Sequence, residues 1–303
     1  MDQAEKLRNI IKKQELPNNQ PVKEVSVEHN AKVITVTSGK GGVGKSSMSV
    51  NLAIQLARRG KRVVIFDADF GLANVEIMLG LHPQYNLADM MFRGKKLKDI
   101  IMYGPENVGF ISGGSGIQEL ANMTRTQVLD LIQKLVALDQ FADVIIVDTG
   151  AGISDAVLEF LVASGEILLV TTPEPTSITD SYSLLKALNG HPGLERDNTQ
   201  ICMIANRVST ANEGEVLFQK LDVVVSRYLK LPITYLGAVP QDPLLAKAVM
   251  QQLPVSLQNP QARSAQAYEE IAAKLMKQDE GQNTQKRGVA AFFSHIIGKR
   301  NNG

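Results

Sequence analysis

Residues 38–47, which read SGKGGVGKSS, have the types and spacing needed to hold a phosphate chain. Gly39, Gly44, Lys45 and Ser46 fit the pattern G-x-x-x-x-G-K-[ST]. Glycines let backbone N–H groups approach an anion closely, and the helix expected after the loop adds free N–H groups at its positive end. In this pattern the lysine contacts the β- and γ-phosphates and the serine hydroxyl binds Mg²⁺. The predicted nucleotide-binding residues are Gly39, Lys40, Gly41, Gly42, Val43, Gly44, Lys45, Ser46 and Ser47.

Three aspartates could supply the metal and water chemistry that hydrolysis of a triphosphate needs. Asp67 and Asp69 follow an apolar stretch, and residues at i and i+2 of a strand point to the same side. Asp148 follows the unbroken apolar run 144–147, which is typical of a strand buried on both faces of a parallel sheet. An aspartate there can reach Mg²⁺ through water, and Gly150 offers a backbone N–H to the γ-phosphate. The alternatives are a solvated turn for the pair and a turn cap for Asp148.

The elements that would position these residues alternate along the chain between apolar runs and helical patterns. Such alternation predicts an α/β fold with a doubly wound, mainly parallel sheet and helices on both faces. Its ligand site is expected at the carboxyl ends of the strands. Strands are expected at residues 33–37, 62–66, 108–111, 144–147, 167–171, 201–205 and 233–239. Helices are expected after the phosphate loop and at residues 97–102, 213–229 and 260–277, among others.

The composition limits the class of protein. With 303 residues and 44% hydrophobic content, the chain is long enough for one large α/β domain with a substantial core. A net charge of +1 gives no overall attraction to nucleic acid or to a membrane. The single cysteine, Cys202, excludes a disulfide framework and indicates a reducing compartment. No apolar run reaches the ~20 residues of a membrane span, so we expect a cytoplasmic protein.

The run KGGVGKS at residues 40–46 resembles the deviant phosphate loop of the MinD/ParA family, which also includes the nitrogenase iron protein. The resemblance covers residues 31–277 and implies an ATPase that forms ADP and phosphate with Mg²⁺ and dimerises with ATP. It implies that Lys40 crosses the dimer interface to the partner's nucleotide, like an arginine finger worth roughly 10³–10⁵ in rate. It also assigns Asp67 to the outer coordination of Mg²⁺ and Asp69 to orienting the attacking water. The alternative for Lys40 is a solvated loop lysine.

Residues 206–209 read NRVS at the end of the predicted strand 201–205. Guanine-binding members of the superfamily have N-K-x-D at this place, and the lysine and the aspartate are missing here. This difference favours adenine, with Asn206 bonding the base edge through its amide. The resemblance adds Arg207, and a closing loop with Pro240 and Asp242, to the adenine site. The alternative for Asn206 is that it caps a loop.

Residues 1–30 precede the predicted core and comprise a short helical pattern and a flexible linker. The pattern resembles the DQAxxLR signature of the FlhG group (also written YlxH or FleN) within the MinD/ParA family. The matching residues are Asp2, Gln3, Ala4, Leu7 and Arg8. The sequence DTGAG at residues 148–152 also resembles that group. In it the peptide stimulates FlhF, a GTPase related to those of the signal-recognition particle. The alternative is a frayed terminus without a function.

Residues 278–303 comprise a polar linker and a predicted amphipathic helix. The single apolar stripe of this helix, spaced i, i+3, i+4, i+7 and i+8, consists of Val289, Phe292, Phe293, Ile296 and Ile297. Basic residues flank the stripe, as in helices that lie in a membrane interface. We therefore predict reversible attachment to the inner face of the cell membrane, strengthened when a dimer presents two helices. The alternative is a helix docked on its own domain.

The FlhG resemblance implies an ATP-dependent switch that regulates flagellar number or placement. Its implied partners are FlhF, flagellar C-ring proteins (FliM/FliN or FliY) and membrane lipids. Two alternatives stay open within the family, namely a MinD-type division-site regulator and a ParA-type ATPase that partitions DNA. A metabolic P-loop enzyme is a third alternative. We expect no nucleic-acid partner, because a DNA-partitioning protein needs a basic surface and does not carry an amphipathic tail.

Overall fold

The computed structural model describes residues 31–69, 74–113, 135–281, 288–289 and 291–292. Within this part of the chain, one eight-stranded sheet has the order β3-β4-β2-β5-β1-β6-β7-β8. The strands are β1 (Lys32–Thr37), β2 (Val63–Ala68), β3 (Met102–Tyr103), β4 (Gly109–Ser112), β5 (Val144–Thr149), β6 (Glu166–Thr171), β7 (Gln200–Val208) and β8 (Thr234–Pro240). All neighbouring strands pair in parallel except β3 and β4. The prediction of a doubly wound, mainly parallel sheet is confirmed.

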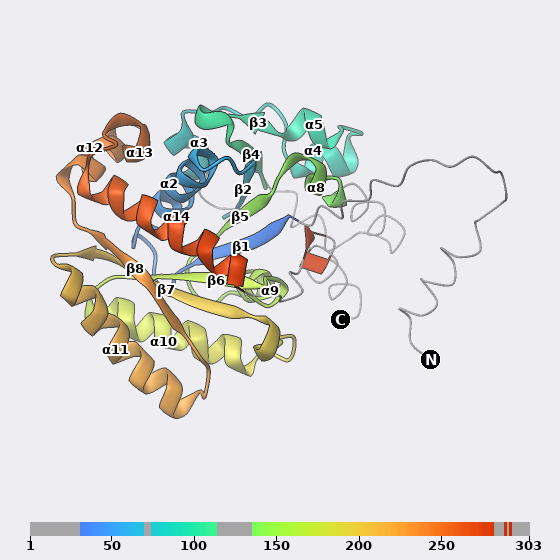
Figure 1. Ribbon diagram of the computed structural model, residues 1–303. Helices are drawn as coiled ribbons and strands as arrows, with labels where there is room; N and C mark the ends of the chain where they lie inside the picture. The colour runs from blue at the N-terminus through green and yellow to red at the C-terminus, as the bar shows by residue number, and fades with distance from the viewer. Residues whose placement is uncertain (1–30, 70–73, 114–134, 282–287, 290, 293–303) are drawn as a thin grey trace, which may run out of the picture.

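Helices cover both faces of this sheet (Figure 1). They are α2 (Lys45–Arg58), α3 (Asn74–Leu79), α4 (Leu87–Phe92), α5 (Leu97–Ile100), α8 (Leu138–Phe141), α9 (Asp155–Ala163), α10 (Pro175–Gly190), α11 (Ala211–Tyr228), α12 (Pro243–Met250), α13 (Val255–Gln258) and α14 (Arg263–Gly281). Helices α2 and α14 pack together on one face, whereas α10 and α11 pack together on the other. Short 3₁₀ turns lie at Pro105–Asn107 and Arg196–Asn198.

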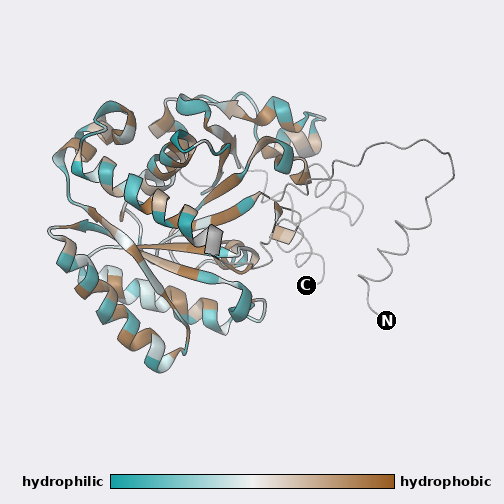
Figure 2. Cartoon of the chain, viewed as in Figure 1, coloured by the Kyte–Doolittle hydropathy of each residue, from teal (hydrophilic) through white to brown (hydrophobic). Residues whose placement is uncertain are grey.

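The central strands of the sheet are buried along their whole length. Every position of β1, β2 and β5 is buried, as expected for parallel strands between two helical layers. Figure 2 shows the hydrophobic residues concentrated on the strands and on the inner sides of the helices, with hydrophilic residues facing outward. Asp67 and Asp148 are therefore exceptions in an apolar layer, and both lie at the carboxyl ends of their strands. Such buried carboxylates need a compensating partner.

Two predicted element boundaries are wrong. The helix expected at residues 97–102 ends at Ile100, because Ile101 is extended and the next two residues pair with β4 as the antiparallel strand β3. The helix expected at residues 260–277 lies further along the chain, because α14 begins at Arg263 and ends at Gly281.

The beginning of the C-terminal tail is docked on the domain. Val289 and Phe292 are fully buried in a cluster on the face of the sheet that α9 covers. The Phe292 ring stacks on Phe160 of α9 with centroids 6.1 Å apart, and Phe160 meets Phe66 of β2 edge to face at 6.2 Å. The docked alternative thus describes these two residues in this conformation. The other tail residues predicted to bind membrane (Phe293, Ile296, Ile297) and the N-terminal peptide (Asp2, Gln3, Ala4, Leu7, Arg8) lie outside the described residues.

No helix in the described part of the chain is both long enough and apolar enough to cross a membrane.

Candidate functional site

The phosphate loop connects the end of β1 to the first residue of α2, Lys45. Gly42 and Gly44 have positive φ values of 75° and 95°, which residues with a side chain rarely adopt. At Gly44 a Cβ would also lie 2.3 Å from the side-chain nitrogen of Asn206. The glycine pattern of the sequence is therefore required by the backbone conformation and by the close approach of β7.

Gly39, the first glycine of the motif, packs against the backbone of helix α10. A Cβ at Gly39 would lie 2.2 Å from the carbonyl carbon of Asp180, a separation that no real packing permits. The loop is also fixed from within, because the Ser38 hydroxyl donates a hydrogen bond to the Lys40 carbonyl at 2.9 Å. Helix α10 and the phosphate loop thus form one packed unit, which the sequence motif alone does not reveal.

Asp148 is the centre of a buried polar cluster beneath the loop. Its carboxylate is completely buried and accepts hydrogen bonds from the Lys45 ammonium at 3.3 Å and the Ser46 hydroxyl at 2.7 Å. It also accepts one from Ser49 at 2.7 Å. Sequence reasoning missed Ser49, although its position three residues after Ser46 on one helix face was an available signal. Lys45, predicted to bind phosphate, and Ser46, predicted to bind Mg²⁺, thus both contact Asp148, the aspartate predicted to reach Mg²⁺ through water.

Asp67 lies directly beside Asp148, because the two are register partners on β2 and β5. Burial and, next in size, the negative charge of Asp148 raise the pKa of the Asp67 carboxyl, which lies at about 7. The Asp69 N–H, which donates to Asp67 at 3.0 Å, and the charge of Lys45 oppose this shift of the pKa. The two neighbouring carboxyl groups of Asp67 and Asp148 thus face one cation, Lys45, among the contacts described. The oxygen donors from Asp67, Asp148 and Ser46 are the ligand types that Mg²⁺ prefers, so these residues fit the ion.

Asp69 lies near the loop that follows β5. A Cβ built on Gly150 would lie 3.8 Å from the Asp69 carboxylate, an ordinary contact distance, so the two residues are neighbours. The same loop is tied to the phosphate loop, because the Gly152 N–H donates to the Ser38 carbonyl at 2.9 Å. The structure thus brings together Asp69, which was predicted to orient the attacking water, and Gly150, which was predicted to contact the γ-phosphate.

Lys40 and Lys45 come from the same loop but have different surroundings. Lys45 is buried, whereas the Lys40 side chain is 38% exposed. The Lys40 ammonium donates hydrogen bonds to Glu174 at 2.8 Å and to the Thr176 hydroxyl at 3.0 Å. The hydrogen bond and the charge of Lys40 lower the pKa of the Glu174 carboxyl. Sequence reasoning missed Glu174 and Thr176, because only the strand order of the structure places β6, which they follow, beside β1.

Asn206 is buried at the carboxyl end of β7 and holds the phosphate loop. Its side-chain nitrogen donates to the Val43 carbonyl at 2.7 Å. The amide nitrogen therefore caps the phosphate loop, as the alternative for Asn206 expected. Its side-chain oxygen is buried without a partner among the described residues, which leaves an acceptor for an amino group such as that of adenine. Arg207, which follows it, is exposed and has a left-handed backbone with φ of 58°.

Asp242 has a structural role in this conformation. One carboxylate oxygen caps α12 by accepting from the Leu244 N–H at 2.9 Å. The other accepts from the Ser264 N–H at 3.0 Å and the Ser264 hydroxyl at 2.8 Å. Although burial raises the pKa of Asp242, these hydrogen bonds hold the pKa below its usual value. The predicted closing loop, which also contains Pro240 at the end of β8, is thereby fixed against α14.

The sheet topology and the phosphate loop over paired aspartates define a P-loop NTPase. Residues 29–276 match the ParA family, described as NUBPL iron-transfer P-loop NTPase. The chain is 41% identical over 84% of its length to the antiactivator FleN of Pseudomonas aeruginosa, covering 89% of that protein. It is 34% identical over 88% of its length to the flagellum site-determining protein YlxH of Helicobacter pylori, covering 90% of that protein. The crystal structure of the Pyrococcus furiosus cell division ATPase MinD superposes with a TM-score of 0.63 at 25% identity, over 82% of this chain and 99% of that one.

The chain therefore belongs to the MinD/ParA family of P-loop ATPases, and within that family to the group that contains FleN and YlxH.

Proposed function

We propose that this protein is an ATP-driven dimerising switch that regulates the number or placement of bacterial flagella. The similarity to FleN and YlxH along most of the chain supports the flagellar role. The main observation that supports the switch is that two lysines of the phosphate loop differ in their burial. Lys45 is buried against Asp148, whereas Lys40 lies at the surface on Glu174. The exposure of Lys40 supports the proposal that this lysine acts on a second molecule.

Within one protomer, the buried cluster binds and orients the nucleotide. Lys45, which bonds Asp148, would contact the β- and γ-phosphates, and Ser46, Asp67 and Asp148, which lie together, would hold Mg²⁺ directly or through water. The bound Mg²⁺ would neutralise charge on the phosphates. Asp69 orients the attacking water, which is the main task left to the protein in phosphoryl transfer. The partnerless oxygen of Asn206 accepts from the adenine amino group.

Hydrolysis needs a second protomer in this proposal. Lys40 leaves Glu174 and Thr176 when ATP brings two chains together, and it then contacts the phosphates bound by the partner. The ion pair with Glu174 is largely exposed, so solvent screens it and it is easily broken. Charge stabilisation supplied across an interface can raise the rate roughly 10³–10⁵-fold. The ATP state is therefore dimeric and limited in time by its own hydrolysis.

The tail gives this switch a membrane output. Val289 and Phe292 are buried in the conformation described, so they are hidden from lipid until the tail undocks. Their docking partner Phe160 lies on α9, the helix that begins a few residues after Gly150. A rearrangement of the loop at Gly150 on dimerisation can therefore reach the docking site. The released stripe, continued by Phe293, Ile296 and Ile297, lies in the membrane interface on the inner face of the cell membrane.

The N-terminal peptide gives the second output. Asp2, Gln3, Ala4, Leu7 and Arg8 form the motif that stimulates FlhF, and the flagellar C-ring proteins FliM/FliN or FliY are the other partners in this proposal. The residues ahead of β1 argue against a MinD-type division regulator, which begins almost directly at the first strand. A DNA-partitioning role is the second alternative.

Deleting the gene and restoring either the wild type or Asp69→Ala tests this function. We expect deletion to change the number or position of flagella counted by electron microscopy, and only the wild type to restore them. Division sites and plasmid inheritance should stay normal in the deletion strain. Normal flagella together with minicells or with plasmid loss would overturn the proposal in favour of the MinD-type or the ParA-type alternative.

A further inference from the structure

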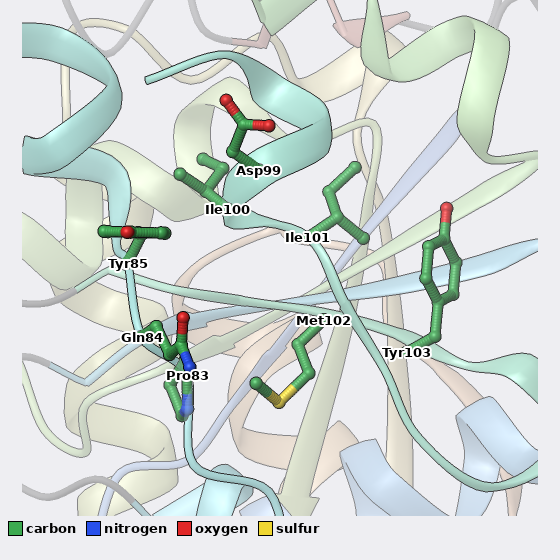
Figure 3. A pocket seen from close by; sticks show the side chains of 8 residues that line it. All are labelled: Pro83, Gln84, Tyr85, Asp99, Ile100, Ile101, Met102 and Tyr103. Atoms are coloured by element: carbon green, nitrogen blue, oxygen red, sulfur yellow. The ribbon is translucent and has the colours of Figure 1, made fainter. Parts of the chain in front are cut away.

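A pocket lies at the outer edge of the sheet, on a part of the chain that nucleotide binding does not use. We call it the edge pocket. It has a volume of about 310 Å³ and lies between the loop at Pro83–Tyr85 and the strand β3. Figure 3 shows Tyr85 on one side of this pocket, Tyr103 on the other, and Ile101 and Met102 between them. A hollow of this size can accept one or two large side chains from a partner.

The walls of the edge pocket combine apolar side chains with the polar groups of Gln84, Asp99 and the two tyrosines, and they are held in place from below. Ile100 and Ile101 belong to the buried cluster under α4 and α5, so they form a fixed floor. Tyr103 is 48% exposed although it is a strand residue. Beyond β3, no further strand pairs with the sheet within the described residues. An open strand edge beside an apolar hollow is the arrangement that protein domains use to bind extended peptides.

Positive charge surrounds this hollow. The run RGKKLK at residues 93–98 contributes four cations, of which Arg93, Lys96 and Lys98 are exposed. The Lys95 ammonium lies 3.7 Å from the centroid of the Tyr85 ring, which fixes a positive charge at the wall of the pocket.

The acidic residues of this segment are already engaged. Asp89 accepts from the Asn86 N–H and from Arg93, and Asp99 accepts from the Lys96 N–H at 2.9 Å. The hydrogen bonds from Asn86 and Arg93 lower the pKa of Asp89, so it stays ionised and committed to its local partners. Asp99 itself lines the pocket, and the N–H that it accepts from carries no charge, so this carboxylate offsets part of the positive charge. Lys95, Lys96 and Lys98 outnumber it, so residues 95–99 carry a net positive charge.

We infer that the edge pocket binds an acidic segment of another protein that carries a bulky aromatic or aliphatic side chain. The side chain enters between Tyr85 and Tyr103, and the acidic flanks lie along Lys95 and Lys98. A lipid bilayer does not fit as well, because a flat surface cannot fill a hollow. This interaction surface is separate from the nucleotide site, from the tail and from the N-terminal peptide.

Selection from a displayed peptide library, with the full-length protein as bait, tests the inference. We expect the selected peptides to contain an aromatic or aliphatic residue with aspartate or glutamate on both sides. Their affinity should fall about tenfold or more for Tyr103→Ala, as for truncation of an anchoring contact. Tyr228→Ala, which alters a tyrosine that is 64% exposed on α11, is the matched control and should bind like the wild type.

Charge reversal supplies the second arm. Lys95→Glu with Lys98→Glu should weaken the selected peptides about tenfold or more and reduce the salt dependence of binding, whereas Lys61→Glu with Lys277→Glu should not. Selected peptides without acidic excess, peptides that bind all variants equally, or a library that yields no binder would overturn the inference. Loss of binding to phosphatidylglycerol vesicles by the Lys95→Glu, Lys98→Glu variant, with peptide binding unchanged, would assign the surface to lipid instead.

Discussion

Replacing Phe160 with leucine should increase membrane binding without changing any residue of the tail. Phe160 is 2% exposed and stacks on Phe292 with centroids 6.1 Å apart. An aromatic pair is worth about 0.5–1.5 kcal/mol beyond the area it buries. With the poorer filling of the site by leucine, we expect the docked tail to lose about 1–2 kcal/mol, which raises the released fraction roughly 5–30-fold. The tail released by this substitution keeps its whole apolar stripe.

Co-sedimentation with phosphatidylglycerol-containing vesicles measures this effect. Phe160→Leu should bind more than the wild type when no nucleotide is present, and Phe292→Glu should not bind with or without ATP. Phe110→Leu is the matched control, because Phe110 is equally buried but belongs to the cluster on the opposite face of the sheet. The reasoning is refuted if Phe160→Leu and Phe110→Leu sediment alike while both stay folded by circular dichroism.

Two further predictions concern the nucleotide site. The pKa of Asp67 is raised to about 7 in the folded state, so the folded protein binds more protons than the unfolded one between about pH 4 and pH 7, and stability without nucleotide falls as pH rises through this window. The free energy of urea unfolding of Asp67→Asn, relative to that of the wild type, should be higher at about pH 8 than at about pH 5. The same relative free energy at both pH values would contradict this prediction. Gly39→Ala should lose about 1–3 kcal/mol, because its Cβ meets the backbone of Asp180 at 2.2 Å. Thermal unfolding checks this against Gly190→Ala at the end of α10, the helix that contains Asp180, because a Cβ at Gly190 meets nothing. Equal losses of stability in the two variants would argue against the packing of Gly39 on α10.

The parts of the site that could be predicted are those that local sequence determines. The phosphate loop is a contiguous motif, and Asp67 and Asp148 end apolar strands, so topology alone places them at one edge of the sheet. The contacts that were missed join residues far apart in the chain. The bond from Lys40 to Glu174 spans 134 residues, and the bond from Asn206 to Val43 spans 163. No local sequence pattern predicts either of these two hydrogen bonds.

The tail shows a different limit of sequence reasoning. An amphipathic stripe predicts that one face is buried, but the same spacing serves a lipid surface and a protein core. The docking of Phe292 on Phe160 is decided by the shape of the cluster that receives it, which the sequence does not display. The edge strand β3 escaped prediction for a related reason, because its two residues are too few to show an alternating pattern.

The central claim is that Lys40 acts on the nucleotide of a partner, and complementation between two inactive variants tests it most directly. Lys40→Ala lacks the lysine supplied to the partner, and Asp69→Ala lacks the residue that orients water in its own site. Each should hydrolyse ATP poorly alone. A mixed dimer has one complete site, so an equimolar mixture with random pairing should recover about a quarter of wild-type turnover. No recovery in a mixture that forms mixed dimers, or wild-type turnover by dilute, monomeric Lys40→Ala, would contradict the account.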